Sequence, residues 1–142
     1  MQITNVNFAL GGMNVQTWDP PPYVPPTYYL WSWGYNGSGA LGVGNNINRS
    51  SPVQIGALTT WLKIAAGYDH NLAITTDGAL WSWGYNNSGR LGLGNTTSVS
   101  SPVQIGALTT WSSIDAGDYH NMAVKTDGTL WAWGVMASAN WV

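Results

Sequence analysis

A tandem repeat of 50 residues constrains this chain more than any other feature of its sequence. When residues 30–79 are laid over residues 80–129 without a gap, 34 of the 50 positions are identical. A third copy begins at Leu130 and departs from the pattern at Val135. Because the chain has 142 residues, only two full periods fit. The fold must therefore consist of structural units of this length that stack on one another.

Each period holds short apolar runs bounded by Gly, Asn, Asp or Pro, which is typical of β-strands. We expect strands over residues 61–66, 71–76 and 79–84, and a fourth, shorter strand around residues 53–55. The dipeptide Asp77-Gly78 recurs one period later and predicts a two-residue hairpin loop. Within residues 80–84, alternation places Trp81 and Trp83 on one face of the strand, with Leu80 and Ser82 on the other.

Four strands per period of about 50 residues predict an all-β fold of β-propeller blades, each with four antiparallel strands. Nine strands are expected from residue 29 to residue 134, so one chain holds about two to two and a half blades. The Trp-x-Trp pairs recur at one phase of the repeat, which predicts that most of them are buried between blades. If they were exposed instead, they would form platforms on which sugar or base rings stack. Ahead of the repeats, residues 1–28 should form a strand over residues 3–10 and a proline-rich connector in polyproline II conformation.

The composition excludes several functions. Apolar residues make up 44% of the chain, which is the proportion of a chain that packs. Four Lys and Arg residues against six Asp give a net charge of -2, so no basic surface exists for nucleic acid or for an anionic membrane. The absence of Cys excludes disulfides and thiolate chemistry. No apolar run reaches the length of about 18 residues that a membrane-spanning helix needs.

No catalytic, cofactor-binding or metal-binding residue is predicted. His70 and His120 share one phase of the repeat, but their acidic neighbours do not, so we interpret both as packing residues bonded to backbone. Gly37, Gly39 and Gly42 satisfy G-x-G-x-x-G, yet no helix signal follows them. These glycines are therefore interpreted as positive-φ positions in a loop between strands.

Two segments of the period carry a resemblance to a known family. The first runs Leu-Trp-Ser-Trp-Gly-Tyr-Asn-Asn-Ser-Gly-Arg-Leu-Gly-Leu-Gly over residues 80–94, and the second runs from Ala66-Gly67 through His70 to Asp77-Gly78. Together they resemble the repeat of the regulator of chromosome condensation family, over residues 30–134. Kelch and WD-type blades fit less well, because their glycine and aromatic layouts differ. The resemblance implies a propeller that usually closes with seven blades.

The resemblance implies a fold more than a function, because such repeats serve as exchange factors, ubiquitin-ligase modules and interaction scaffolds. An exchange factor is not favoured, since the chain has neither seven repeats nor a basic arm. Our first hypothesis is a non-enzymatic structural or adhesive protein of a bacteriophage virion, because the surface is poor in charge and rich in Asn, Gly, Ser and Thr. The alternative is a soluble, cytoplasmic protein-protein interaction module, or a fragment of a longer seven-bladed propeller.

An array of two to two and a half blades leaves strand edges unpaired, and natural proteins cover or close such edges. We therefore expect a homo-oligomer, with a trimer favoured, whose ring is closed by strand exchange between subunits. Other virion proteins or a host-surface receptor are the further partners under this hypothesis. The candidate interface residues are Phe8, Trp18, Pro21, Pro22, Tyr23, Trp131, Trp133 and Trp141. The run Pro20-Pro21-Pro22-Tyr23 also matches the motif that WW domains bind, although a stiff connector is the favoured interpretation.

Overall fold

The computed structural model describes residues 3–7, 14–18, 21–24 and 26–135, and these residues form eleven β-strands. The strands are β1 (Ile3–Asn7), β2 (Asn14–Trp18), β3 (Trp31–Gly34), β4 (Arg49–Gln54), β5 (Trp61–Ala66), β6 (His70–Thr75), β7 (Leu80–Gly84), β8 (Val99–Gln104), β9 (Trp111–Ala116), β10 (His120–Lys125) and β11 (Leu130–Gly134). No described residue is helical, so this part of the chain offers no helix able to cross a membrane.

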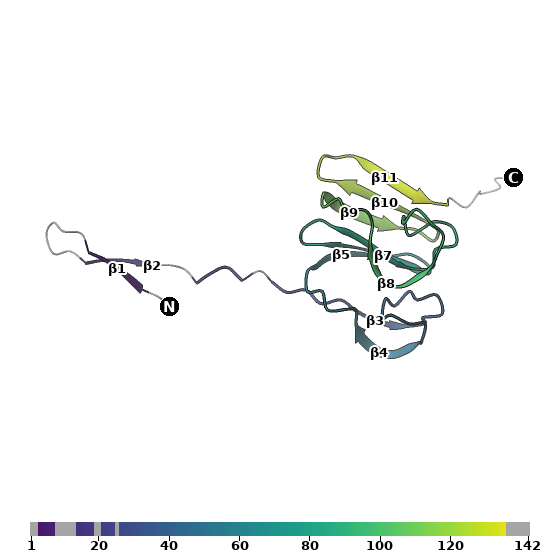
Figure 1. Ribbon diagram of the computed structural model, residues 1–142, viewed down its shortest axis with the longest axis horizontal. Coiled ribbons are helices and arrows are strands. Elements are labelled where there is room, and N and C mark those ends of the chain that lie inside the picture. The colour runs from purple at the N-terminus through teal and green to yellow at the C-terminus, as the bar shows by residue number, and fades with distance from the viewer. Residues whose placement is uncertain (1–2, 8–13, 19–20, 25, 136–142) are drawn as a thin grey trace.

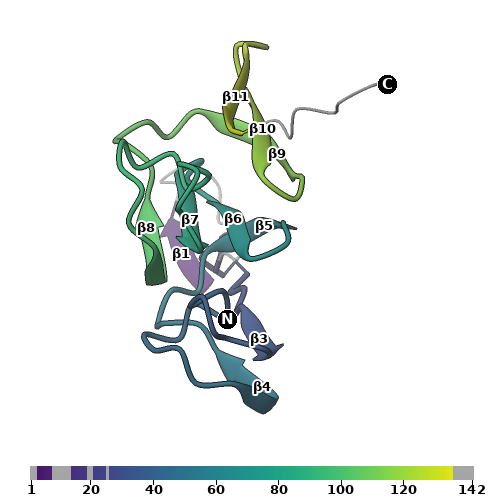
Figure 2. The same cartoon turned by 90° about the vertical axis from the view of Figure 1, so that its right-hand side faces the viewer.

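Three antiparallel sheets stack side by side (Figures 1 and 2), and we number them as blades. Blade 1 is β3-β4, blade 2 is β5-β6-β7-β8, and blade 3 is β9-β10-β11. One complete four-stranded blade is thus flanked by two partial ones. The predictions of an all-β fold and of nine strands within the repeats are confirmed.

The Asp-Gly segments close the hairpins, but with a three-residue loop instead of the predicted two-residue loop. The N–H of Thr75 donates to the carbonyl oxygen of Ala79 at 3.0 Å, and the N–H of Gly78 donates to that of Thr75 at 2.8 Å, so Thr76 and Asp77 are the central residues of the turn. Asp77 does not have the positive φ that a two-residue Asp-Gly loop needs. β6 pairs with β7 in the register Ile74 to Leu80, and the Thr75 hydroxyl donates to a carboxylate oxygen of Asp77 at 2.6 Å. Gly78 follows with a φ of 82°, and a Cβ there would lie 2.3 Å from the carbonyl oxygen of Thr109, which lies in the connection that leads into blade 3. The turn therefore requires glycine for its backbone conformation and for its contact with this connection.

The hydrophobic core lies between the blades and is divided in two. One cluster, made of Ile55, Trp61, Ala73 and Trp83, joins blade 1 to blade 2. The other cluster, made of Ile74, Leu80, Trp111 and Ala123, joins blade 2 to blade 3. β7 contributes Trp83 to the first cluster and Leu80 to the second, so the predicted alternation along this strand is confirmed.

The prediction that most Trp-x-Trp side chains are buried is wrong. Trp83 is 1% exposed, whereas Trp31, Trp33 and Trp131 are 52%, 61% and 49% exposed. Trp33 is equivalent to Trp83 in the repeat, and Trp31 is equivalent to Trp131, but the burial of a ring depends on the neighbouring blade. Among the described residues, blade 1 has a neighbour on only one side, so its tryptophans are left at the surface.

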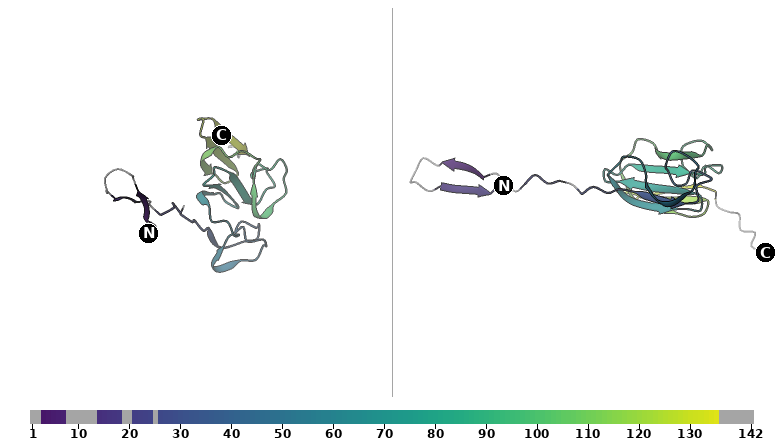
Figure 3. Two further views of the ribbon diagram at one scale, coloured as in Figure 1. Left: turned by 60° about the vertical axis from the view of Figure 1, so that its left-hand side comes forward. Right: turned by 90° about the horizontal axis from the view of Figure 1, so that it is seen from below.

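The N-terminal segment contains one strand more than we expect. β1 and β2 form an antiparallel hairpin in which Ile3 is opposite Trp18. Figure 3 shows this hairpin standing apart from the blades. The sequence predicted the first strand and missed the second, and it assigned Trp18 to the connector where the structure places it in β2. The expected continuation of the first strand over residues 8–10 lies outside the described residues.

A buried asparagine organises the loop between the third and fourth strands of a blade. The Asn86 side chain is fully buried, and its amide donates to the carbonyl oxygens of Asn95 and Thr97, both at 3.0 Å. Its side-chain oxygen accepts from the backbone N–H of Leu91 at 2.9 Å. Asn36 makes the same set of bonds one period earlier. One side chain thereby provides hydrogen-bond partners for loop backbone groups that are not paired within any strand.

We predict that Asn86→Ala lowers the free energy of unfolding by at least about 2 kcal/mol, because it leaves several buried backbone groups without partners. Chemical denaturation measures the effect. The matched control is Asn87→Ala, since Asn87 is exposed and bonds only the Tyr85 hydroxyl. Equal losses of stability in the two variants would contradict this account of the loop.

Candidate functional site

The blades are joined through single backbone carbonyl groups. The carbonyl oxygen of Ala40 accepts from the Trp83 indole N–H at 2.9 Å and from the Asn71 side-chain amide at 2.7 Å. Ala40 lies in the loop of blade 1, whereas Asn71 and Trp83 lie in blade 2. A loop of one blade therefore receives two donors from the next blade along the chain.

The same arrangement recurs at the second junction. The carbonyl oxygen of Arg90 accepts from the Trp133 indole N–H at 3.0 Å and from the Asn121 side-chain amide at 2.5 Å. Each acceptor lies one period from its counterpart, and so does each donor. We call this pair of bonds to one carbonyl the blade clamp.

Glycine is required where the indole crosses the loop. Gly42 has a φ of 71°, and a Cβ there would lie 2.8 Å from Nε1 of Trp83. Gly39 also has positive φ, as the sequence predicted, whereas Gly37 does not. The G-x-G-x-x-G run thus belongs to the packing between blades.

His70 crosses the second junction. Its ring is fully buried, and Nε2 lies 2.7 Å from Oδ1 of Asn121 in blade 3. Because the Asn121 amide donates to the Arg90 carbonyl, its oxygen faces the ring and Nε2 of His70 must donate. The prediction that the histidine rings bond to backbone is therefore wrong for His70, whose partner is the side chain that also forms the clamp.

The electrostatics of this position favour neutral imidazole. Burial lowers the pKa of His70 below its ordinary value of 6.5, and the positive charges of Arg90 and His120 act in the same direction. The hydrogen bond to Asn121 and the Asp69 carboxylate raise the pKa and offset part of this effect. Nδ1 has no hydrogen-bond partner among the described residues, so a proton added there would be buried without an acceptor.

Arg90 adds a contact that the first junction lacks. Its guanidinium lies 5.0 Å from the ring centre of Tyr85 and 4.9 Å from that of Tyr119, one ring from each of two blades. One of its N–H groups also donates to the carbonyl oxygen of Asp118 at 3.2 Å. The first junction has Ala40 at this position and therefore no guanidinium between the rings. It is held by the clamp, by the apolar cluster and by a backbone bond from the Gly44 N–H to the Ser100 carbonyl oxygen at 2.8 Å.

Blade 1 presents an open strand edge. The carbonyl oxygen of Leu30 accepts from the N–H of Ile55 at 2.8 Å, so the main-chain groups of Leu30 point toward β4. Alternate residues of a strand direct their main-chain groups to opposite edges, and Trp31 and Trp33 therefore direct theirs away from β4. No described strand pairs along that edge of β3.

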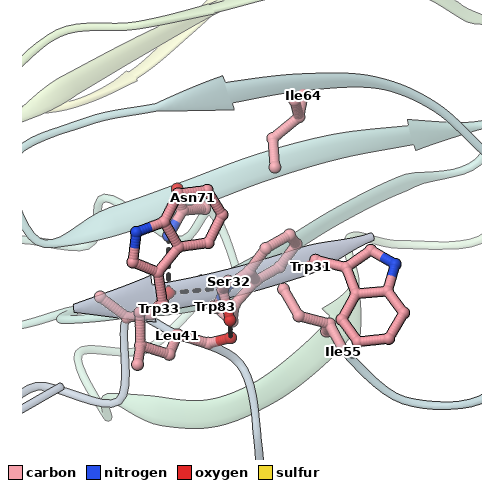
Figure 4. Close-up of a pocket in the computed structure, with 9 residues that line it drawn as sticks. Trp31, Ser32, Trp33, Leu41, Ile55, Ile64, Asn71 and Trp83 are labelled. Carbon is pink, nitrogen blue, oxygen red and sulfur yellow. Dashed lines mark hydrogen bonds between the residues drawn. The ribbon is translucent and has the colours of Figure 1, made fainter. Parts of the chain in front are cut away.

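An apolar pocket of about 250 Å³ lies between this edge and blade 2. Figure 4 shows Trp31 and Trp33 on the β3 side and Ile64 on the opposite side. The remaining side chains that line it are Ser32, Ala40, Leu41, Ile55, Asn71 and Trp83. The lining contains no charged group, so the pocket suits apolar side chains carried on a strand.

The structure distributes the predicted interface residues over several places. Pro21, Pro22 and Tyr23 are exposed in the segment that precedes blade 1. Trp131 is half-exposed on β11 beside Lys125, whose Nζ lies 4.1 Å from its ring centre. Trp133 is half-buried within the second junction.

Three of the predicted interface residues have no described side-chain environment. Phe8 and Trp141 lie outside the described residues. For Trp18 only the strand is described.

Sequence reasoning expected unpaired strand edges but did not locate the one on β3, and it missed the role of Asn71 and Asn121. The two asparagines follow the histidines at the same phase of the repeat, which was the available signal. No group of three or more His, Cys, Asp or Glu side chains suited to a metal occurs among the described residues.

Stacked antiparallel sheets of up to four strands, joined by repeating contacts between consecutive blades, define a segment of a β-propeller. The sequence pattern of the regulator of chromosome condensation (RCC1) repeat matches residues 29–74 and 77–124. A second pattern of the same repeat matches residues 61–90. The chain belongs to this repeat family.

Solved structures of similar proteins are much longer than this chain. Prp20p from Saccharomyces cerevisiae is 26% identical, with a TM-score of 0.67, and the match covers 75% of this chain and 29% of that one. The same yeast protein bound to Kap60 gives 26% identity and a TM-score of 0.65, with coverage of 75% and 28%. Human WBSCR16 is 28% identical, with a TM-score of 0.63, and the match covers 73% of this chain and 28% of that one.

We predict that His70 makes the stability of the protein depend on pH. Below pH 6.5 the unfolded chain takes up a proton that buried His70 resists, so the free energy of unfolding falls as the pH decreases from that value. Denaturant titrations over a pH series measure the slope. The variant His70→Gln should lose this part of the slope, whereas His120→Gln should keep it. A slope unchanged in His70→Gln would refute the assignment.

Proposed function

We propose that this chain is a protein-interaction module within a larger propeller of RCC1 repeats, and that further strands join it at the open edge of β3. One observation carries the proposal. Residues 30–34 have the same sequence as residues 80–84, Leu-Trp-Ser-Trp-Gly, and the second copy pairs with β6 along the edge that is open in β3. Because β3 and β7 have the same sequence, the open edge of β3 suits a partner strand that resembles β6.

Blade 2 supplies a template for that partner. In the β6–β7 pairing, Asn71 is opposite Trp83, Leu72 is opposite Ser82, and Ala73 is opposite Trp81. Ala73 is fully buried among tryptophan rings. Its small side chain leaves room for those rings. We therefore propose that the partner of β3 is a hairpin like β5–β6, with alanine opposite Trp31 and a large apolar residue opposite Ser32.

The residues just before β3 do not fit this role. Counting back one period from β6 leads to residues 20–25, whose sequence is Pro-Pro-Pro-Tyr-Val-Pro. An inner strand of a blade must donate hydrogen bonds to neighbours on both sides, and proline has no N–H to donate. The missing pair of strands must therefore come from another segment or another chain.

The comparisons support an interaction module or a piece of a longer propeller better than they support a virion protein. The yeast protein is itself described as RCC1, and the chain spans less than a third of each of the structures reported above. The structural study of Prp20p describes binding to Gsp1p and histones. We do not propose those partners for this chain. It has only four basic residues, and its match covers only 29% of Prp20p.

The second candidate is self-assembly, in which three copies close a ring by exchanging strands. This candidate is supported by the unpaired strand edges that both partial blades present among the described residues. The strands match imperfectly, however, because β11 and the β3 of another copy would compete for the same position beside β10. In addition, Ser32 and Ser82 each donate a hydrogen bond from the hydroxyl to a loop carbonyl, whereas blade 3 has Ala132 at this position and therefore has no such donor.

A synthetic hairpin of residues 59–78 tests the first proposal. We predict that it binds the chain and protects the backbone N–H groups of Trp31 and Trp33 from hydrogen exchange, because it pairs with the open edge. NMR detects the protection residue by residue. Without the peptide, these two amides should exchange faster than those of Trp81 and Trp83.

The control peptide carries Ala73→Asp, which places a carboxylate under the tryptophan rings and should not bind. Protection by both peptides, or by neither, would show that β3 does not recognise a hairpin of this repeat.

The solution mass separates the two candidates. We predict that light scattering gives the 15.2 kDa of a single chain, because the partial blades of two copies do not combine into one four-stranded sheet. A stable particle of three times that mass would favour self-assembly instead.

A further inference from the structure

The segment that leads into blade 1 contains the pattern Pro-Pro-x-Tyr twice. The first copy is Pro20-Pro21-Pro22-Tyr23, and the second is Pro25-Pro26-Thr27-Tyr28. The two copies lie five residues apart and carry no charged residue. Their sequences alone give no reason to treat them differently, but the structure does.

The second copy is anchored to blade 2. The N–H of Tyr28 donates to the carbonyl oxygen of Thr59 at 2.8 Å, and Tyr28 forms a parallel bridge with Thr60. Its side chain lies with Leu62 along a hollow of about 380 Å³ and is 43% exposed. Part of Tyr28 is therefore already in contact with blade 2.

The first copy is presented to solvent. Tyr23 is 83% exposed and Val24 is 78% exposed, and Pro21 and Pro22 are exposed as well. Residues 21–24 belong to no strand, and Figures 1 and 3 show this part of the chain running extended between β2 and the blades. Tyr23 contributes to the rim of the same hollow but keeps most of its surface free.

The chemistry of the first copy limits what can recognise it. Its prolines donate no hydrogen bonds, so it cannot extend a sheet by pairing with an edge strand. Consecutive prolines favour polyproline II, which costs little conformational entropy to bind. Domains that recognise this conformation do so with grooves lined by aromatic side chains. An exposed tyrosine at the end of the run adds one large, rigid anchor.

We propose that the motif ending in Pro21-Pro22-Tyr23 is a docking site for a partner domain of the WW type, whose aromatic groove binds polyproline II and receives the Tyr23 ring. Tyr28 of the second motif is bonded to blade 2, whereas Tyr23 of the first motif remains exposed. This site lies outside the blades and does not depend on the function proposed for the β3 edge.

The test uses the full chain and an isolated WW domain selective for Pro-Pro-x-Tyr ligands. Isothermal titration calorimetry should show binding of one WW domain per chain. Tyr23→Ala should weaken binding at least about tenfold, because it removes the aromatic anchor. Tyr29→Ala is the matched control, since Tyr29 is 53% exposed and lies outside both motifs, and it should leave the affinity unchanged.

A third variant tests the difference between the two motifs. Pro26→Ala disrupts the second motif while keeping Tyr28, and it should bind the WW domain as tightly as the natural chain. Circular dichroism confirms that each variant is folded.

Three results would overturn the proposal. These are no binding by the natural chain, equal weakening by Tyr23→Ala and Pro26→Ala, and an oligomer of the natural chain that Tyr23→Ala dissociates. The last result would assign the segment to a second copy of the chain instead.

Discussion

The clamp on one backbone carbonyl determines how the rest of the structure is arranged. The Ala40 oxygen can accept from Trp83 and Asn71 only if the loop around it holds its shape, and buried Asn36 fixes that shape. The same indole then fills the apolar cluster between blades, so the polar and apolar parts of the junction share one side chain. Loss of the loop would remove both parts together, which makes a blade junction a cooperative unit.

The sequence predicted the strands well because their signals are local. Apolar runs and turn residues depend on neighbours within a few positions, and the period of 50 residues repeats them. The strands β5, β6 and β7 of blade 2 lie where these signals place them, whereas β8 begins at Val99, four residues before the short strand expected from residue 103. Alternation along residues 80–84 likewise assigned Trp83 and Leu80 to opposite faces correctly. These features follow from backbone geometry, which is the same in every copy of the repeat.

The sequence could not predict properties that depend on the neighbouring blade. Trp33 and Trp83 have the same local sequence, yet one is 61% exposed and the other 1%, because only the second has a loop packed over it. The partner of His70 is 51 residues away, and no local pattern indicates it. The β2 strand was missed because the nearby prolines suggested a connector, and its partner β1 determines its extent.

The junctions have a direction. Each blade offers a carbonyl acceptor on the side of its successor and places its indole and amide donors on the side of its predecessor, so blades fit only in one order. An interface of this kind is heterologous, and its number of units is set by the angle at which the ring closes. An internal duplication of one full period therefore inserts a blade that already matches both neighbours, whereas a duplication of any other length breaks two junctions. Selection for intact junctions would preserve the period of 50 residues even where the surface loops diverge.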